Sequence, residues 1–142
     1  MELYTRVIIP HEVSRELTSA GAPSKVAAWM QNRPERIETR SPSIVSPLPS
    51  AFAETDLNAG EQAAIRFALA EHDVLLLIDE ATGRSVAPRL GLANTGTLGI
   101  LVAAAEVGLV DLKVSLSRLQ STNFRISQSL IIKVLAEAHR ET

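Results

Sequence analysis

The chain has 142 residues, of which 46% are hydrophobic and 21% charged, and this predicts a single globular domain over residues 1–142. It contains no cysteine, which excludes a disulfide framework, a thiol nucleophile and a cysteine-ligated metal site. The formal net charge of −2 excludes a protein that binds nucleic acid through bulk positive charge.

The N-terminal part of the sequence predicts a strand followed by two helices. A β-branched run over residues 6–9 is typical of a buried strand, and a proline then begins a helix over 11–20. A second helix is expected over 24–31, with Trp29 facing inward. Residues 32–56 are rich in proline and serine, which favours an irregular connection with at most one short strand.

The pattern sharpens from residue 57. Asn58 and Glu61 have the spacing of a capping box that opens a helix ending near residue 71. The continuous apolar run over 73–78 is typical of a strand buried on both faces of a parallel sheet. The remaining expected elements are a helix over 82–90, a strand over 92–94, a helix over 98–107 capped by Thr97, and two helices capped by Asp111 and Ser127, the last with Leu130 and Ile131 inside.

Alternating strands and helices predict an α/β fold, a three-layer sandwich with a mostly parallel sheet. Such sheets bind ligands at the carboxyl ends of their strands, where Asp79 and Glu80 follow the run over 73–78. Asp79 could equally cap the next helix, and Glu61 could be only the acid of its capping box. Arg84 follows Glu80 by one helical turn, a spacing that also suits an ordinary ion pair.

The candidate chemistry is limited to carboxylates. Neither a glycine-rich phosphate loop nor a nucleophilic serine motif is present, so a generic nucleotide-binding domain is disfavoured. Glu16 lies at the edge of the apolar stripe of its helix, where it could be solvated or could point toward a cleft. Carboxylates gathered without histidine or cysteine suit Mg²⁺ or Mn²⁺, and such sites commonly cleave phosphodiesters.

Five segments together resemble a PIN domain, and more specifically its VapC-like prokaryotic subfamily: VIIPHEVSREL, LNAGEQAAIRFAL, LLLIDEATGRSVA, GLANTGTLGILVAAAEVGLV and FRISQSLIIKVL. The resemblance implies a ribonuclease of the toxin–antitoxin type that uses Mg²⁺ or Mn²⁺, cleaves RNA and is held by a small antitoxin protein. Matched by motif, the catalytic and metal-holding residues are Glu16, Glu61 and Asp79, with Glu80 as a further ligand and Arg84 and Thr97 as substrate-binding residues.

One departure from the family pattern concerns the N-terminus. PIN domains begin with a strand that ends in an aspartate, whereas this sequence begins at what corresponds to the second strand. The resemblance therefore implies an N-terminally shortened domain. The alternative function is a catalytically incomplete scaffold that binds protein, or one half of a split nuclease.

The same departure carries an expectation about the sheet. Either residues 6–9 pair directly with 75–78, or another chain covers the gap, as a homo-oligomer or a partner that supplies the strand. The N-terminus lacks the pattern of a signal peptide, and the apolar stretch over 98–110 is too short to span a bilayer. We therefore expect a cytoplasmic protein with no membrane partner.

Overall fold

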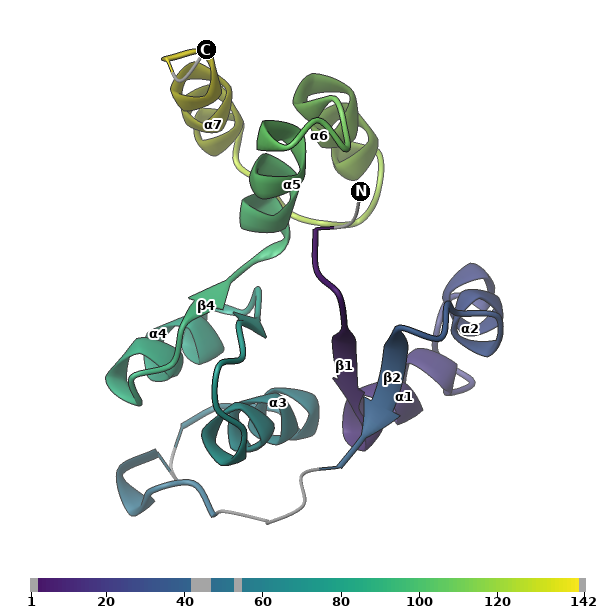
Figure 1. The fold of residues 1–142 in the computed structure, drawn as a ribbon, viewed down its shortest axis with the longest axis vertical. Coiled ribbons are helices and arrows are strands. Elements are labelled where there is room, and N and C mark those ends of the chain that lie inside the picture. The colour runs from purple at the N-terminus through teal and green to yellow at the C-terminus, as the bar shows by residue number, and fades with distance from the viewer. Residues whose placement is uncertain (1–2, 42–46, 53–54, 141–142) are drawn as a thin grey trace. The chain divides into compact units, whose positions relative to one another are not determined.

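The computed structural model describes residues 3–41, 47–52 and 55–140 (Figure 1). The chain divides into two compact units, residues 4–95 and Leu3 with residues 96–140, and each is described by itself. Pro42, which belongs to the proline-rich connection, lies outside the described residues.

The first half of the larger unit contains the predicted strand and helix pair, followed by one further strand. This further strand, Ile37–Arg40, lies in the proline-rich connection, where at most one short strand was expected. The helix after Pro10 is two residues shorter than expected, because the backbone is extended again at Ser19. These four elements are β1 (Val7–Pro10), α1 (His11–Thr18), α2 (Ser24–Gln31) and β2 (Ile37–Arg40).

The inward orientation predicted for Trp29 is wrong. Its side chain lies on the outer side of α2 and the residue is 47% exposed, whereas the neighbouring Met30 is 1% exposed. Val26 and Ala27 are partly buried on the same helix. Because a turn of helix has only one face toward α1, the adjacent Met30 and Trp29 cannot both occupy it fully.

The second half of the larger unit begins with a helix whose N-terminus forms as predicted. The Asn58 side chain accepts from the Glu61 backbone N–H at 2.8 Å, and the Glu61 carboxylate accepts from the Asn58 N–H at 3.1 Å. This is the reciprocal pair of a capping box. The elements are the 3₁₀ turn Ser50–Phe52, α3 (Ala59–Ala70), β3 (Leu76–Leu77), α4 (Ala81–Arg89) and β4 (Asn94–Thr95).

The strands form two parallel pairs, as the mixed α/β prediction requires. β1 pairs with β2, with Val7 opposite Ile37, and β3 pairs with β4, with Leu76 opposite Asn94. Among the described residues β1 and β3 do not pair with each other, so direct closure of the sheet by these two strands is not observed. Helix α3 contacts both β1 and β3.

The core of this unit lies between α3, α4 and one face of β3. Leu76 and Ile78 are buried in it, whereas Leu75 and Leu77 are 44% and 54% exposed. The expectation of a strand buried on both faces is therefore wrong, because alternate side chains of a strand point to opposite sides and only one side is covered here. The other members of this core are Phe52, Leu57, Ile65, Ala68, Val86 and Ala87.

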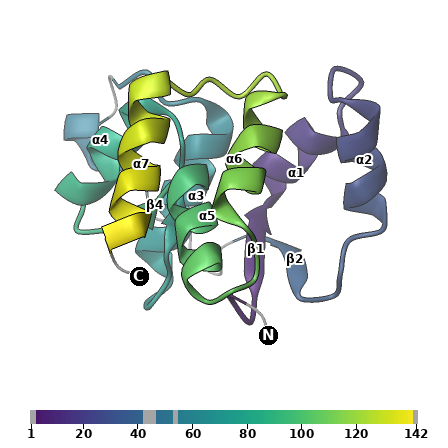
Figure 2. The same cartoon turned by 90° about the horizontal axis from the view of Figure 1, so that it is seen from above.

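The smaller unit consists of three helices (Figure 2): α5 (Thr97–Glu106), α6 (Leu112–Gln120) and α7 (Gln128–Arg140). Helix α6 packs against both others and buries Leu116, while α7 buries Ile131. Asp111 and Ser127 cap as predicted, accepting from the backbone N–H groups of Val114 and Leu130.

Two expectations for this unit are wrong. The N-cap of α5 is Gly96, and Thr97 is the first helical residue rather than the cap. Leu130, expected inside, is 39% exposed, since the adjacent Ile131 takes the buried position. None of the helices described is both long enough and apolar enough to cross a membrane.

Candidate functional site

Glu61 stands in the first turn of α3 with its orientation fixed by the capping box. Its Oε2 accepts from the Asn58 backbone N–H at 3.1 Å. No bond to Oε1 is recorded in the part of the chain that the structure describes. The structural role of Glu61 is thus observed, and it leaves one oxygen of a well-oriented carboxylate for a further ligand.

Glu16 reaches the same turn from a different element. A Cβ placed on Gly60 would lie 3.0 Å from Glu16 Oε1 and 3.2 Å from Oε2, so the carboxylate of this α1 residue rests against Gly60. Glycine at this position lets the acid approach the backbone of α3 closely. Gly60 is a site residue that sequence reasoning missed, although its place directly before Glu61 in the capping box could have indicated it.

Glu16 and Glu61 therefore both lie at the first turn of α3. Helix N-termini favour negative charge, so the helix itself stabilises both acids to some extent. The described residues record no ion pair between either carboxylate and a lysine or arginine. Two neighbouring acids without a basic partner form an oxygen-rich site that a hard divalent cation would suit.

Asp79 and Glu80 lie at the carboxyl end of β3, as predicted. Both side chains are exposed. The N-cap of α4 is Glu80 and not Asp79, which disfavours the reading of Asp79 as the cap of that helix. Its position follows directly from the buried Ile78, which fixes the strand end against the core.

The two substrate-binding candidates lie on α4 and at the start of α5. Arg84 is exposed on α4, and no ion pair of its side chain with Glu80 is recorded in the described ranges. Thr97 is partly buried at the start of α5 and belongs to the smaller unit. Their roles remain predictions from the family resemblance.

The candidate acids provide only part of the ligand set that a divalent cation needs. Within residues 3–41, 47–52 and 55–140 there is no group of three or more histidine, aspartate or glutamate side chains that could hold a metal ion. Glu16 and Glu61 supply two carboxylates from separate elements, and Asp79 and Glu80 supply another pair elsewhere in the same unit. Two carboxylates meet the oxygen-ligand preference of Mg²⁺ or Mn²⁺ but do not complete its coordination.

Comparison with known families shows to which family this chain belongs. A family model described as a PIN domain matches residues 1–140. The chain belongs to the PIN-domain family. No curated protein and no solved structure matches its sequence. PIN domains are a nuclease fold whose members typically use divalent metal ions, which agrees with the carboxylate chemistry found at α3.

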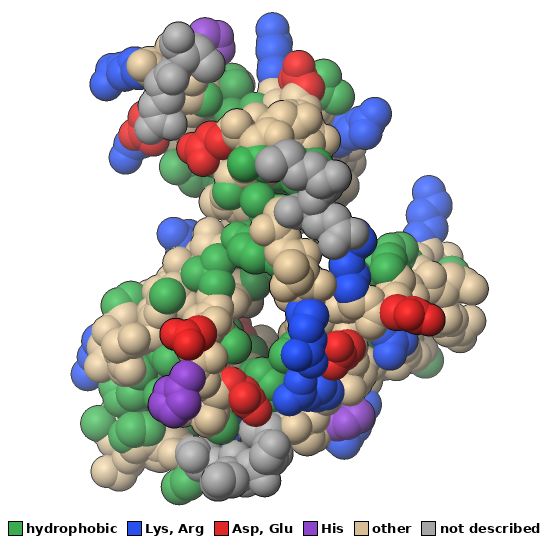
Figure 3. All heavy atoms as spheres, in the orientation of Figure 1, with side chains coloured by type: hydrophobic (Ala, Val, Ile, Leu, Met, Phe, Trp, Pro, Cys, Tyr) green, Lys and Arg blue, Asp and Glu red, His purple; other side chains and the backbone are tan. Residues whose placement is uncertain are grey.

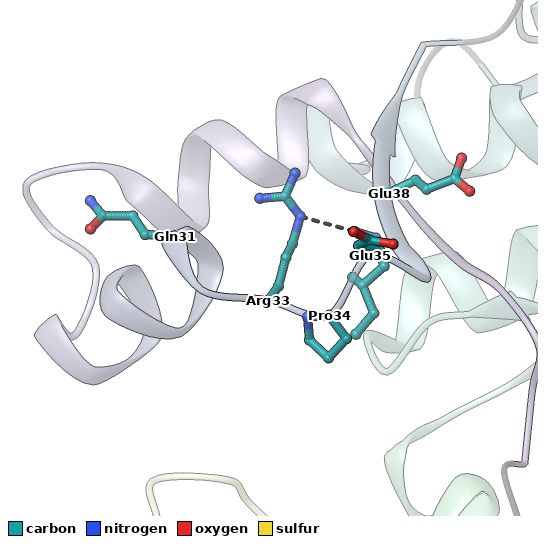
Figure 4. Close-up of a pocket in the computed structure, with 6 residues that line it drawn as sticks. Gln31, Arg33, Pro34, Glu35 and Glu38 are labelled. Atoms are coloured by element: carbon teal, nitrogen blue, oxygen red, sulfur yellow. Dashed lines mark hydrogen bonds between the residues drawn. The ribbon is translucent and has the colours of Figure 1, made fainter.

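A hollow of about 280 Å³ in this PIN domain has a lining that includes none of the candidate acids Glu16, Glu61, Asp79 and Glu80 (Figure 4). Arg33 occupies its wall, and its guanidinium donates to the backbone carbonyls of Ile37 at 3.0 Å and Met30 at 2.7 Å. These bonds tie the end of α2 to β2, so the arginine is structural. The lining residues are Gln31, Arg33, Pro34, Glu35, Ile37 and Glu38.

A charged network, which sequence reasoning missed, joins β1, β2 and α3. Arg6 donates to both oxygens of Glu38, at 3.1 and 2.9 Å, and this hydrogen bonding lowers the pKa of Glu38 and raises that of Arg6. Arg40 approaches Glu71 at 3.8 Å and lies 5.8 Å from the centre of the Phe67 ring. Figure 3 shows basic and acidic side chains intermixed in this part of the surface. The pairing requires the β1–β2 register, which no local pattern reveals.

Proposed function

We propose that this PIN domain is a metal-dependent ribonuclease of the toxin–antitoxin type. The observation that carries the proposal is the approach of Glu16 to Gly60, which brings the carboxylate of α1 to the turn of α3 that carries Glu61. Membership of the PIN family supports a nuclease, and the lack of a nearby histidine or cysteine favours a metal ion over nucleophilic protein chemistry.

The residues of the candidate site divide into metal ligands, groups that position them and groups that bind RNA. Glu16 and Glu61 would hold Mg²⁺ or Mn²⁺, with Asp79 and Glu80 as further ligands carried over from the family motif. The ion would neutralise charge on the scissile phosphate and activate the attacking water. The Asn58 backbone N–H orients the Glu61 carboxylate, and Gly60 admits the Glu16 carboxylate to the same turn. Arg84 would contact a phosphate oxygen, and the Thr97 hydroxyl would donate a hydrogen bond to the RNA.

The partners of this activity are RNA and a small antitoxin protein in the cytoplasm, with a homo-oligomer or a strand-supplying chain as further partners. These assignments rest on the resemblance to the VapC-like subfamily. An antitoxin would suppress cleavage by covering the acids.

Glu61→Gln gives the sharpest test. Glutamine retains the capping box, so the variant should keep its melting temperature while it loses a charged metal ligand. RNA cleavage with Mg²⁺ or Mn²⁺ should fall at least about a hundredfold, the order expected when a charge-stabilising group is removed. Asp79→Asn should have a comparable effect, and Glu137→Gln on α7 serves as an exposed control. Unchanged cleavage by Glu61→Gln would contradict the proposal, and equal activity of Asp79→Asn would remove Asp79 from it.

A catalytically incomplete scaffold is the second candidate. It is favoured by the finding that no three acidic or histidine side chains among the described residues gather into a metal-holding group. Such a scaffold would bind protein without cleaving RNA. Calorimetric titration with Mn²⁺ separates the two functions, because an active site should bind the ion whereas the scaffold should release no heat at millimolar concentration.

A further inference from the structure

Trp29 is an exposed aromatic residue on the outer face of α2. It is 47% exposed, whereas Met30 is 1% exposed and Val26 is partly buried on the other side of the same helix. No hydrogen bond of its indole N–H is recorded in the part of the chain that the structure describes. An indole combines a large apolar ring with one hydrogen-bond donor, and here both are accessible to a ligand.

Lys25 lies one helical turn before Trp29 on this face. Residues four apart on a helix are neighbours, with Cβ atoms about 5–6 Å apart. Lys25 is exposed, and no ion pair of its ammonium group is recorded among the described residues. Ser24 and Ala28, which lie beside the pair, are exposed and small, so their side chains leave room next to the indole. The face therefore presents an accessible ring and an accessible cation one turn apart.

The sequence around α2 carries positive charge. Residues 17–34 contain Lys25 and Arg33 and no aspartate or glutamate, although the whole chain has 16 acidic and 14 basic residues. Arg33 donates to the backbone carbonyls of Met30 and Ile37, which leave it positively charged at the end of the same helix. A local excess of positive charge attracts an anionic ligand to this face.

A nucleotide of a single strand fits this combination. Its base can stack on an aromatic ring while its phosphate contacts a cation, and the reach from a base to its own phosphate is comparable to one turn of helix. A protein partner needs a broader surface than one indole among small and polar residues, since stable interfaces bury about 800 Å² on each side. A second copy that met this face across a two-fold axis would bring two Lys25 ammonium groups together.

We propose that the outer face of α2 binds one nucleotide of single-stranded RNA, whose base stacks on the Trp29 indole and whose phosphate contacts the Lys25 ammonium group. The choice of RNA rests on the proposed function, whereas the stacking site itself needs neither a metal ion nor cleavage. Helix α1, which carries Glu16, packs against both α2 and α3. An RNA strand that crosses α1 would therefore reach Trp29 from the proposed metal ligands.

The test is the binding of dye-labelled octauridine to the full chain, measured by anisotropy in EDTA so that no cleavage occurs. Trp29→Ala should weaken binding about tenfold, because stacking on an aromatic side chain contributes at least that order per base. Trp29→Phe should retain most of the affinity, because a phenyl ring still stacks. Ile132→Ala, which truncates a 62% exposed side chain on α7, is the matched control and should bind as the parent does.

The phosphate contact has a separate readout. Lys25→Gln should lower the slope of log affinity against log salt concentration by about 0.7, the value for one phosphate contact of a single strand. Lys113→Gln, at an exposed position of α6, is the matched control and should leave that slope unchanged.

The sole tryptophan gives one indole N–H signal in the NMR spectrum, which reports on the parent chain without any substitution. Saturating octauridine should shift this signal, because a stacked base changes the magnetic environment of the ring. Should Trp29→Ala unfold, this shift and the affinity of Trp29→Phe still decide the matter.

Four results would overturn the proposal. Equal affinities of Trp29→Ala and Ile132→Ala, or an indole signal that saturating octauridine leaves unchanged, would remove Trp29 from RNA binding. An indole signal that shifts with protein concentration in the absence of RNA would assign the face to a second copy, and tighter binding of octathymidine would assign it to DNA. RNA cleavage that persists alongside any of these results would leave the nuclease intact, whereas stacking without cleavage would remove the proposed function alone.

Discussion

Gly83 of α4 lies directly against Ile78 of β3, with no room for a side chain between them. A Cβ on Gly83 would contact Ile78 Cδ1 and would lie 2.8 Å from Cγ1, well inside van der Waals contact. Ile78 is 5% exposed and Gly83 is buried in α4, so neither residue can move freely. The glycine thus fixes how closely the helix follows the strand that carries Asp79 at its end.

Gly83→Ala should therefore destabilise the fold. Overpacking costs about 1–3 kcal/mol, and the gain in helix propensity returns only about 1 kcal/mol. Urea unfolding measures the difference. Gly21→Ala, around which nothing lies within 4 Å, is the control for the substitution itself and should not destabilise the fold. Stabilisation by Gly83→Ala would contradict the close packing of Gly83.

The alternation along β3 predicts opposite outcomes for neighbouring residues. Ile78→Asp places an unpaired charge in the core and should cost about 3–5 kcal/mol. Leu77→Asp, at a 54% exposed position, should change the free energy of unfolding by less than about 1 kcal/mol. Denaturant melts of the two purified variants compare them directly. A severe loss in Leu77→Asp would show that this side of the strand is covered in solution.

Gly60→Ala should separate metal binding from stability. The new methyl group would displace the exposed Glu16 carboxylate, which can move into solvent, and would lie 3.2 Å from Val13 Cγ2, which would have to shift slightly. The melting temperature should change little, because the gain in helix propensity offsets this tight contact. The affinity for Mn²⁺ should fall roughly tenfold, as when a ligand loses its positioning. Gly21→Ala, with open space around it, controls for the substitution itself. Unaltered Mn²⁺ affinity would argue against a shared site for Glu16 and Glu61.

The Arg6–Glu38 pair should make stability depend on acid. The hydrogen bond from Arg6 lowers the pKa of Glu38, so the pair stabilises the fold above the ordinary carboxyl value of 4.5 and stops doing so as pH falls through the lowered pKa. Glu38→Gln should melt slightly below the parent at pH 7 and level with it at pH 2. The effect should be small because the pair is partly exposed. A difference that persists unchanged at pH 2 would exclude this linkage.

The sequence predicts most elements because caps and periodicity are local signals. Asn58, Asp111 and Ser127 begin their helices as expected, since a cap needs only the residues of one turn. The exposed side of β3 was not predictable, because a continuous apolar run does not reveal whether its second face has a cover. Trp29 and Met30 illustrate the same limit on a helix, where the neighbour α1 decides which of two adjacent apolar residues is buried.

The candidate site was predicted less completely. The capping box located Glu61, and the family motif indicated Glu16, but their meeting over Gly60 depends on how α1 packs against α3. That packing is a long-range property. The association of Asp79 with these acids is likewise long-range, and it stays a prediction that the activity of Asp79→Asn tests.

The exposed position of Trp29 determines what optical spectroscopy can see in this protein. It is the sole tryptophan, and it lies at the surface of α2 rather than in the core. Its emission should be red-shifted already in the native state and should change little when the core around Ile78 melts. Fluorescence will therefore follow events at α2, while global unfolding has to be followed by circular dichroism.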